Sequence, residues 1–169
     1  MRATTSTPIY LALLAFFALA SNPAAAQNAS ELNGTWIVTS WTSPDGVVNE
    51  DAQRGVFLFT ITRDDGGSYS MMFVPGDEPR AEYSGEQPTD EDKLRAYDSF
   101  TANSGRLTVQ GPELTYEAYV AKDPNYMASF EDNGATATWE VDQSTLTLVF
   151  TSGFLDGGTA TFRRPTSGE

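Results

Sequence analysis

The side chains in this sequence that can transfer a proton are carboxylates and tyrosines, because the chain contains no histidine and no cysteine. The absence of histidine removes the commonest general base and the commonest metal ligand, so a Ser-His-Asp triad is excluded. The absence of cysteine removes thiol catalysis and cysteine-based zinc sites. We therefore expect no metal centre and no cofactor, and any catalysis would depend on tyrosine and carboxylate groups.

Glu117 is the carboxylate whose position best fits proton transfer. It lies in the middle of an alternating segment between Tyr116 and Ala118, and it would face an interior if Tyr119 did. A carboxyl group in apolar surroundings has a raised pKa and can donate a proton. Tyrosine hydroxyls are candidates for orienting a polar group of a ligand, although a buried tyrosine needs a hydrogen-bond partner for structural reasons alone. The tyrosines considered for this role are Tyr69, Tyr116, Tyr119 and Tyr126.

Two runs of acidic residues are interpreted as solvated surface rather than as an acid–base pair. Asp64-Asp65 lies in a turn, and Asp90-Glu91-Asp92 lies at the expected start of a helix, where acidic residues are favoured. The sequence contains no Asp-x-Asp-x-Asp-Gly calcium loop.

The first 26 residues have the pattern of a secretory signal peptide. Arg2 supplies a positive start, residues 9–20 form an apolar run, and small residues at 24–26 offer a cleavage site before Gln27. The run is too short to cross a bilayer as a mature helix, which needs about 20 apolar residues, and no other segment approaches that length. We expect cleavage near Ala26 and a secreted or periplasmic protein.

The mature chain would comprise residues 27–169, which is 143 residues after 26 are removed from 169, a length that suits one domain. Without Arg2 it carries nine Lys and Arg against 23 Asp and Glu, a net charge of about −14. Such a surface repels nucleic acid and anionic lipid, so we expect no nucleic-acid partner and no membrane span. With no disulfide, stability must come from a hydrophobic core.

Nearly every segment of the mature chain alternates apolar and polar residues at the period of a β-strand. Turn residues separate the segments, for example Asp64-Asp65-Gly66-Gly67. Strands are expected at residues 34–42, 55–63, 68–74, 106–110, 113–121, 126–131, 135–141, 145–151 and 159–164. This spacing predicts an all-β fold, an antiparallel up-and-down barrel of about eight or nine strands with one short helix.

The alternation stops after the third expected strand. Residues 75–88 are polar and rich in Pro and Gly, which is typical of a long loop. Loops of this length in compact domains often act as lids or binding elements, so this segment is our candidate lid.

A helix is expected to follow the loop. Thr89 and Asp92 have the spacing of a capping box at a helix start. The residues that then recur at helical spacing are Leu94, Tyr97, Phe100 and Thr101. We therefore predict a short amphipathic helix over residues 90–103 that lies against the barrel.

Three stretches of the mature chain carry a family resemblance. The first is Leu32-Asn33-Gly34-Thr35-Trp36-Ile37-Val38-Thr39-Ser40, and the second is Tyr69-Ser70-Met71-Met72-Phe73-Val74. The third runs from residue 100 to residue 164 and ends in a pair of arginines. In this order and spacing they resemble the lipocalin-like domain family of the calycin group, whose first and third strands match the first two stretches. The resemblance implies a barrel that holds a small apolar or amphipathic molecule.

Two details of the resemblance bear on particular residues. Barrels of this kind carry a Gly-x-Trp on the first strand, here Gly34 and Trp36, and an arginine on the last, here Arg163 or Arg164. The resemblance implies that the indole closes one barrel end under a stacked arginine, a contact worth about 0.5–2 kcal/mol, although the indole as a cavity floor is the alternative. Alternation places the two arginines on opposite faces, so the sequence leaves open which one stacks. Many relatives carry His where this chain has Tyr116, so imidazole chemistry is not carried over.

Large side chains on the apolar strand faces are candidates for ligand contact as well as for ordinary core. Small eight-stranded barrels either fill with side chains or hold one small ligand. The residues predicted to contact a ligand are Phe59, Met71, Phe73, Tyr116, Trp139 and Phe150.

Three functions remain open from the sequence. The leading hypothesis is an extracytoplasmic barrel that binds a small hydrophobic or amphipathic ligand. The alternative is a barrel with a filled interior that interacts with or inhibits a protein partner. The third is an isomerase or cyclase that acts on a lipid-like substrate, for which Glu117 or Tyr116 would supply the chemistry.

Overall fold

The computed structural model describes residues 27–49, 55–74, 80–128, 134–153 and 155–168. The expected signal peptide, residues 1–26, lies outside the described residues. Within the described residues the regular structure is mostly strand, with two short α-helices and one 3-10 turn.

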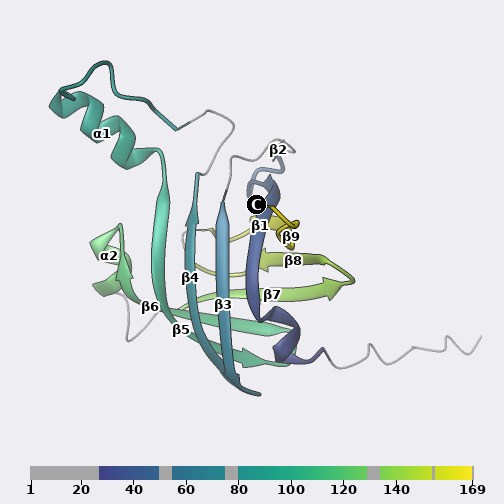
Figure 1. The fold of residues 1–169 in the computed structure, drawn as a ribbon. Helices are drawn as coiled ribbons and strands as arrows, with labels where there is room; N and C mark the ends of the chain where they lie inside the picture. The colour runs from purple at the N-terminus through teal and green to yellow at the C-terminus, as the bar shows by residue number, and fades with distance from the viewer. Residues whose placement is uncertain (1–26, 50–54, 75–79, 129–133, 154, 169) are drawn as a thin grey trace, which may run out of the picture.

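Eight strands form a closed antiparallel ring, and each strand pairs with its neighbours in the chain (Figure 1). The ring closes where the first strand pairs with the last, so that Ile37 lies opposite Arg163 and Thr42 opposite Thr159. The strands of the ring are β1 (Gly34–Thr42), β3 (Val56–Arg63), β4 (Gly66–Phe73), β5 (Thr101–Gln110), β6 (Glu113–Ala121), β7 (Ala135–Asp142), β8 (Thr145–Phe150) and β9 (Thr159–Arg163). A two-residue strand that was not expected, β2 (Val48–Asn49), adds to the end of β1. The predicted up-and-down barrel is confirmed.

The two ends of the barrel differ. At the plugged end, tight turns join β3 to β4, β5 to β6 and β7 to β8, and the 3-10 turn η1 (Ala29–Leu32) leads into β1. At the opposite end, called here the loop end, lie the longer connections and both helices, α1 (Asp90–Asp98) and α2 (Pro124–Ala128). Figure 1 shows α1 projecting beyond the barrel at this end.

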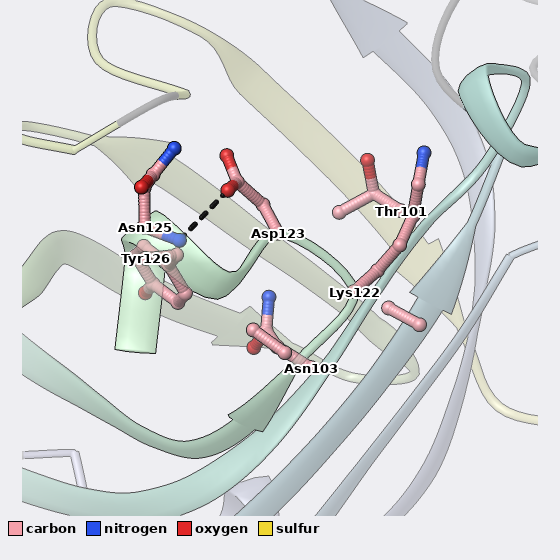
Figure 2. A pocket seen from close by; sticks show the side chains of 8 residues that line it. Thr101, Asn103, Lys122, Asp123, Asn125 and Tyr126 are labelled. Carbon is pink, nitrogen blue, oxygen red and sulfur yellow. Dashed lines mark hydrogen bonds between the residues drawn. The ribbon is translucent and has the colours of Figure 1, made fainter. Parts of the chain in front are cut away.

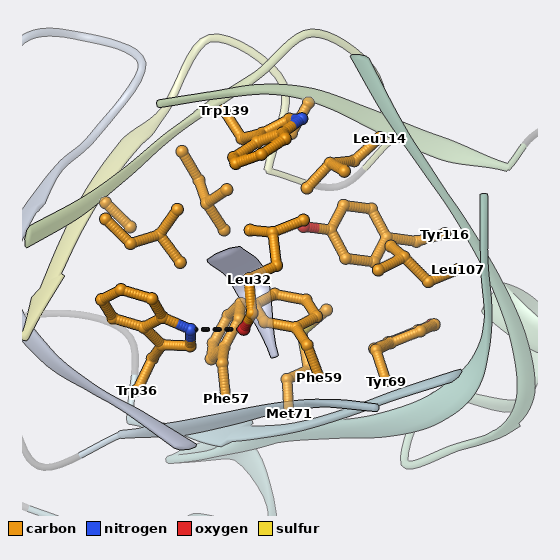
Figure 3. Close-up of a cluster of buried hydrophobic side chains, with 14 of the residues drawn as sticks. Leu32, Trp36, Phe57, Phe59, Tyr69, Met71, Leu107, Leu114, Tyr116 and Trp139 are labelled. Atoms are coloured by element: carbon orange, nitrogen blue, oxygen red, sulfur yellow. Dashed lines mark hydrogen bonds between the residues drawn. The ribbon is translucent and has the colours of Figure 1, made fainter. Parts of the chain in front are cut away.

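The barrel interior is filled by the inward-facing residues of every strand. Burial alternates along the strands as the sequence pattern predicted, for example in β4, where Tyr69, Met71 and Phe73 are buried. Figure 3 shows Leu32 from η1 near the centre of this cluster, with aromatic side chains around it. Each large apolar side chain buried in this way contributes about 1.5–3 kcal/mol relative to an exposed one. The core therefore supplies the stability that the absence of disulfides requires.

The helix prediction over residues 90–103 was wrong in its second half. The capping box is confirmed, since Thr89 Oγ1 accepts a hydrogen bond from Asp92 N, but α1 ends at Asp98. From Thr101 onward the chain is strand β5, which pairs with β4 over its whole length, and this ladder outweighs the weak helical spacing. The face predicted to pack on the barrel is largely exposed, because Leu94 is 59% exposed.

The strand predicted at residues 126–131 is also wrong as far as the structure describes it. Helix α2 occupies Pro124–Ala128, and residues 129–133 lie outside the described residues. A proline suits the first helical position because its missing N–H would have no partner there. Asp123 supports this helix start, because its Oδ1 accepts a hydrogen bond of 2.9 Å from Asn125 N.

A bulge in β6 changes which residues face inward. Ser104 pairs with Val120 while Gly105 pairs with Ala118, so Tyr119 is an extra residue in β6. Regular alternation would place Val120 on the same inner face as Ala118, but the bulge turns it outward and it is 59% exposed. Gly105 permits the close strand approach, because a Cβ there would lie 1.9 Å from the backbone oxygen of Glu117.

The candidate lid, residues 75–88, is only partly described. Residues 75–79 lie outside the described residues, and residues 80–88 form neither helix nor strand. The loop joins α1 through the buried carboxylate of Asp92, which accepts hydrogen bonds from Ser84 Oγ at 2.8 Å and from Thr89 N at 3.0 Å. These bonds hold the pKa of Asp92 well below its usual range. No helix in the described part of the chain is long and apolar enough to cross a membrane.

Candidate functional site

The plugged end is closed by an indole under a guanidinium. The Cζ of Arg164 lies 3.7 Å from the ring centroid of Trp36, and the indole Nε1 donates a hydrogen bond of 2.7 Å to Leu32 O. Arg164 also donates bonds of 2.7 Å to the backbone oxygens of Asn33 and Glu31. These contacts join the end of the last strand to η1, and the side chain of Trp36 is fully buried beneath them.

Gly34 and Arg163 complete this end. Gly34 has a φ of +106°, and a Cβ there would lie 3.0 Å from Nη1 of Arg164, so glycine fits both the backbone conformation and the guanidinium. Arg163 lies in the ladder opposite Ile37 and donates a bond of 3.1 Å to Arg164 O. The sequence did not decide whether Arg163 or Arg164 stacks on Trp36, and in the structure it is Arg164.

The residues predicted to contact a ligand all lie in the packed interior. Phe59, Met71, Phe73, Tyr116, Trp139 and Phe150 are each buried. They pack against one another and against neighbouring aromatics, and the rings of Tyr69 and Tyr116 meet edge to face with centroids 5.0 Å apart. A cavity of only about 10 Å³ borders Phe73, which is about the space of one water molecule.

A larger pocket lies at the loop end, between the start of β5, the end of β6 and α2 (Figure 2). Its volume is about 350 Å³, within the range of small-molecule sites. The described residues that line it are Thr101, Ala102, Asn103, Ala121, Lys122, Asp123, Asn125 and Tyr126. None of the six residues predicted to contact a ligand is among them.

The two strands and the short helix position this lining. Asn103 pairs with Ala121 one step beyond the β6 bulge, so both side chains are directed to the inner side of the ring. Lys122 N donates a bond of 2.8 Å to Ala102 O, which carries the pairing to the end of β6. Helix α2 begins two residues later and brings Tyr126 over the pocket, where this residue packs against the core.

Asn103 is the buried polar side chain in the lining. It is 5% exposed, and among the described residues its Oδ1 has no hydrogen-bond partner. A buried amide oxygen without a partner costs about 1–3 kcal/mol. Figure 2 shows this side chain at the base of the pocket, beneath Asp123 and Tyr126. The group is therefore available to a molecule that enters the pocket.

Tyr126, which lines the pocket, has two buried tyrosines as neighbours. Tyr69 and Tyr116 are buried on β4 and β6, and Tyr126 lies close enough to affect the ionisation of both. Burial raises the pKa of Tyr69 and the pKa of Tyr116 well above the ordinary tyrosine value. The phenols therefore stay uncharged and act as neutral hydrogen-bonding groups.

Lys122 lines the pocket with its aliphatic stem and directs its charge elsewhere. Its Nζ donates a bond of 2.7 Å to Phe100 O and lies 4.3 Å from the ring centroid of Tyr97. The hydroxyl of Tyr97 donates in return a bond of 2.6 Å to Lys122 O. The ammonium group therefore connects α1 to the start of β5 at the pocket rim.

The prediction that Glu117 faces the barrel interior was wrong. Glu117 lies on the outer face of β6, where its carboxylate is paired with the guanidinium of Arg106. The hydrogen bond from Arg106 lowers the pKa of Glu117, the opposite of the raised pKa expected for an acid among apolar side chains. Tyr119 is also exposed, because it follows the inward-facing Ala118 on β6. In the described part of the chain, no group of three acidic residues is arranged to hold a metal ion.

Sequence reasoning missed the polar centre of the pocket. Asn103 was assigned to a helix, and Lys122 and Asp123 to a simple turn. The sequence offered little signal, because the small and polar residues 101–105 show no apolar alternation and are placed in a strand only by their pairing with β4.

The closed ring of antiparallel strands, plugged at one end and carrying loops at the other, defines the class of this protein as a lipocalin-like barrel. No protein family and no curated protein matches its sequence. Three solved structures are similar to it. A redesigned beta barrel is 15% identical, with 83% of this chain and 97% of that chain covered and a TM-score of 0.46.

The other two similar structures come from Bacteroides. A lipocalin-like protein from Bacteroides uniformis is 18% identical, with 79% of this chain and 98% of that chain covered and a TM-score of 0.45. An uncharacterized protein from Bacteroides eggerthii is 12% identical, with 79% and 99% covered and a TM-score of 0.44.

Proposed function

We propose that this barrel binds a small amphipathic molecule in the pocket at its loop end, between β5, β6 and α2. The observation that carries the proposal is a pocket of about 350 Å³ with the buried amide of Asn103 in its lining. Apolar walls and a few polar groups are the usual composition of small-molecule sites. The centre of the ring is filled with side chains, so binding at the loop end replaces binding in the lumen.

A neutral fluorescent amphipath, N-phenyl-1-naphthylamine, tests this proposal. Ala121 lines the pocket, and Val120 is its outward-facing neighbour on the same strand. We expect the dye to brighten with the native protein and with Val120→Trp, and to remain dim with Ala121→Trp, which fills the pocket. Melting temperatures of both variants establish that each is folded.

Two results would contradict the proposal. One is a native protein that leaves the dye dim, and the other is equal brightening by Ala121→Trp and Val120→Trp. Should Ala121→Trp fail to fold, Ala121→Leu provides the same test with a smaller side chain that still occupies part of the pocket.

The site of action belongs to the same proposal. The signal-like pattern of residues 1–26 supports a secreted or periplasmic protein whose ligand is met outside the cytoplasm. Mass measurement of the protein recovered from its own compartment tests this, because a cleaved chain is expected to begin near Gln27. A chain of full length recovered from the cytoplasm would contradict it.

The filled interior favours a second function, that of a barrel that contacts a protein partner through its outer surface. Apolar side chains are exposed on the outer faces of β3, β4 and β6 near the loop end, including Val56, Met72 and Val120. A partner that is retained by the native protein and lost with Met72→Lys, while dye binding is unchanged, would support this function. Retention that is unaffected by Met72→Lys would contradict it.

A further inference from the structure

The polar groups that a ligand meets in the pocket carry no charge. Asn103 offers an amide, Thr101 a hydroxyl and Tyr126 a phenol, and all three belong to the lining. Tyr126 has the buried phenols of Tyr69 and Tyr116 as neighbours, and these are uncharged because burial raises the pKa of each. An amide or hydroxyl on a ligand can exchange hydrogen bonds with such groups in either direction.

The positive charge at the pocket is already engaged. Lys122 is the one cationic side chain among the described residues of the lining, and its Nζ is bonded to Phe100 O and stacked on Tyr97. Figure 2 shows this side chain extending beside Thr101, away from Asn103. For the ammonium group to pair with a carboxylate at Asn103, it would have to give up its contacts with Phe100 O and Tyr97.

The negative charge at the pocket also disfavours an anion. Asp123 lies on the rim, and its carboxylate is exposed where a ligand would enter. The whole chain carries a formal net charge of −13, so the field at the entrance repels anions. Moving a carboxylate from water to a buried site without a cationic partner is strongly unfavourable, because the charge loses its hydration.

We propose that the pocket selects amphipaths whose polar end is uncharged, such as a primary amide or an alcohol, over amphipaths that end in a carboxylate. This inference rests on the proposed function, since it assumes that the loop-end pocket is the binding site. The buried amide of Asn103 is the group that forms hydrogen bonds with the polar end of the ligand.

Octanamide and octanoate provide a matched test, because they share chain length and shape and differ in charge at neutral pH. We expect titration calorimetry at pH 7 to show octanamide binding at least tenfold more tightly than octanoate. The variant Asn103→Leu is expected to remove most of this difference. Gln110→Leu, at the far exposed end of the same strand, is the control and is expected to preserve it.

The outcomes separate this inference from the proposed function. Equal or tighter binding of octanoate would overturn the uncharged-end inference while leaving the pocket as a binding site. Loss of octanoate affinity on Lys122→Met would also overturn the uncharged-end inference, because it would show that Lys122 pairs with the carboxylate. Retention of the tenfold preference by Asn103→Leu would overturn the role of Asn103. Failure of both ligands to bind the native protein, together with a dim dye, would overturn the proposed function itself.

Discussion

Asn103 and Ala121 lie opposite each other across β5 and β6, one step beyond the bulge that adds a residue to β6. Without the bulge, the alternation of β6 would direct Val120 inward and Ala121 outward. The extra residue reverses this order, so that a small side chain faces the polar amide. The open space of the pocket depends on that reversal.

Gly105→Ala is expected to disturb the bulge. A Cβ at this position would lie 1.9 Å from the backbone oxygen of Glu117, so the two strands must separate. We expect the free energy of unfolding to fall by about 1–3 kcal/mol, the range for overpacked sites, with loss of dye binding. Urea unfolding measures the change. Gly85→Ala is the control, because a Cβ there meets open space, and an equal loss in both variants would contradict the explanation.

Arg164→Met is expected to weaken the plugged end. The substitution removes the stacking on Trp36 and the hydrogen bonds to the backbone oxygens of Asn33 and Glu31. We expect the free energy of unfolding to fall by about 1–3 kcal/mol, while the loop-end pocket still binds the dye. Arg63→Met removes an exposed arginine paired with Asp65 and serves as the control. An effect no larger than that of the control would show that Arg164 does not hold the end closed.

Asp92→Asn is expected to make the 80–98 segment insensitive to acid. The folded pKa of Asp92 is lowered, so its ionised form stabilises the capped segment above the ordinary carboxyl pKa of about 4. That contribution is lost as the pH falls below this value, through the folded pKa. Hydrogen exchange of α1 amides should accelerate on acidification in the native protein and depend less on pH in the variant. Parallel pH profiles of the two proteins would contradict the assignment.

The strands could be predicted because their core positions repeat every second residue. The alternation of Tyr69, Met71 and Phe73 placed β4 correctly, and the same pattern placed β1 and β6 to β9. The pairing of β5 with the neighbouring strand β4 was harder to predict. Residues 101–105 pair with β4 although their small and polar side chains give no apolar alternation, so sequence alone favoured the helix.

The pocket could not be predicted, because it depends on two departures from regular pattern. One is the extra residue in β6, because the residue type at Tyr119 does not indicate a bulge. The other is the helical turn that begins at Pro124. Apolar residues such as Phe59 and Trp139 led us to predict a ligand site in the lumen, but their side chains fill the lumen as core. The inward position of Asn103 follows from the pairing of β5 with its neighbours, which the sequence pattern did not indicate.

Backbone and indole chemical shifts, recorded by NMR while octanamide is added, test the central claim most directly. The account predicts that signals of Asn103, Ala121 and Tyr126 move in proportion to one another, while the indole signals of Trp36 and Trp139 stay fixed, because those indoles donate to backbone oxygens in the packed interior. Movement of the two indole signals with unchanged signals from the loop-end residues would place the ligand in the lumen and contradict the account.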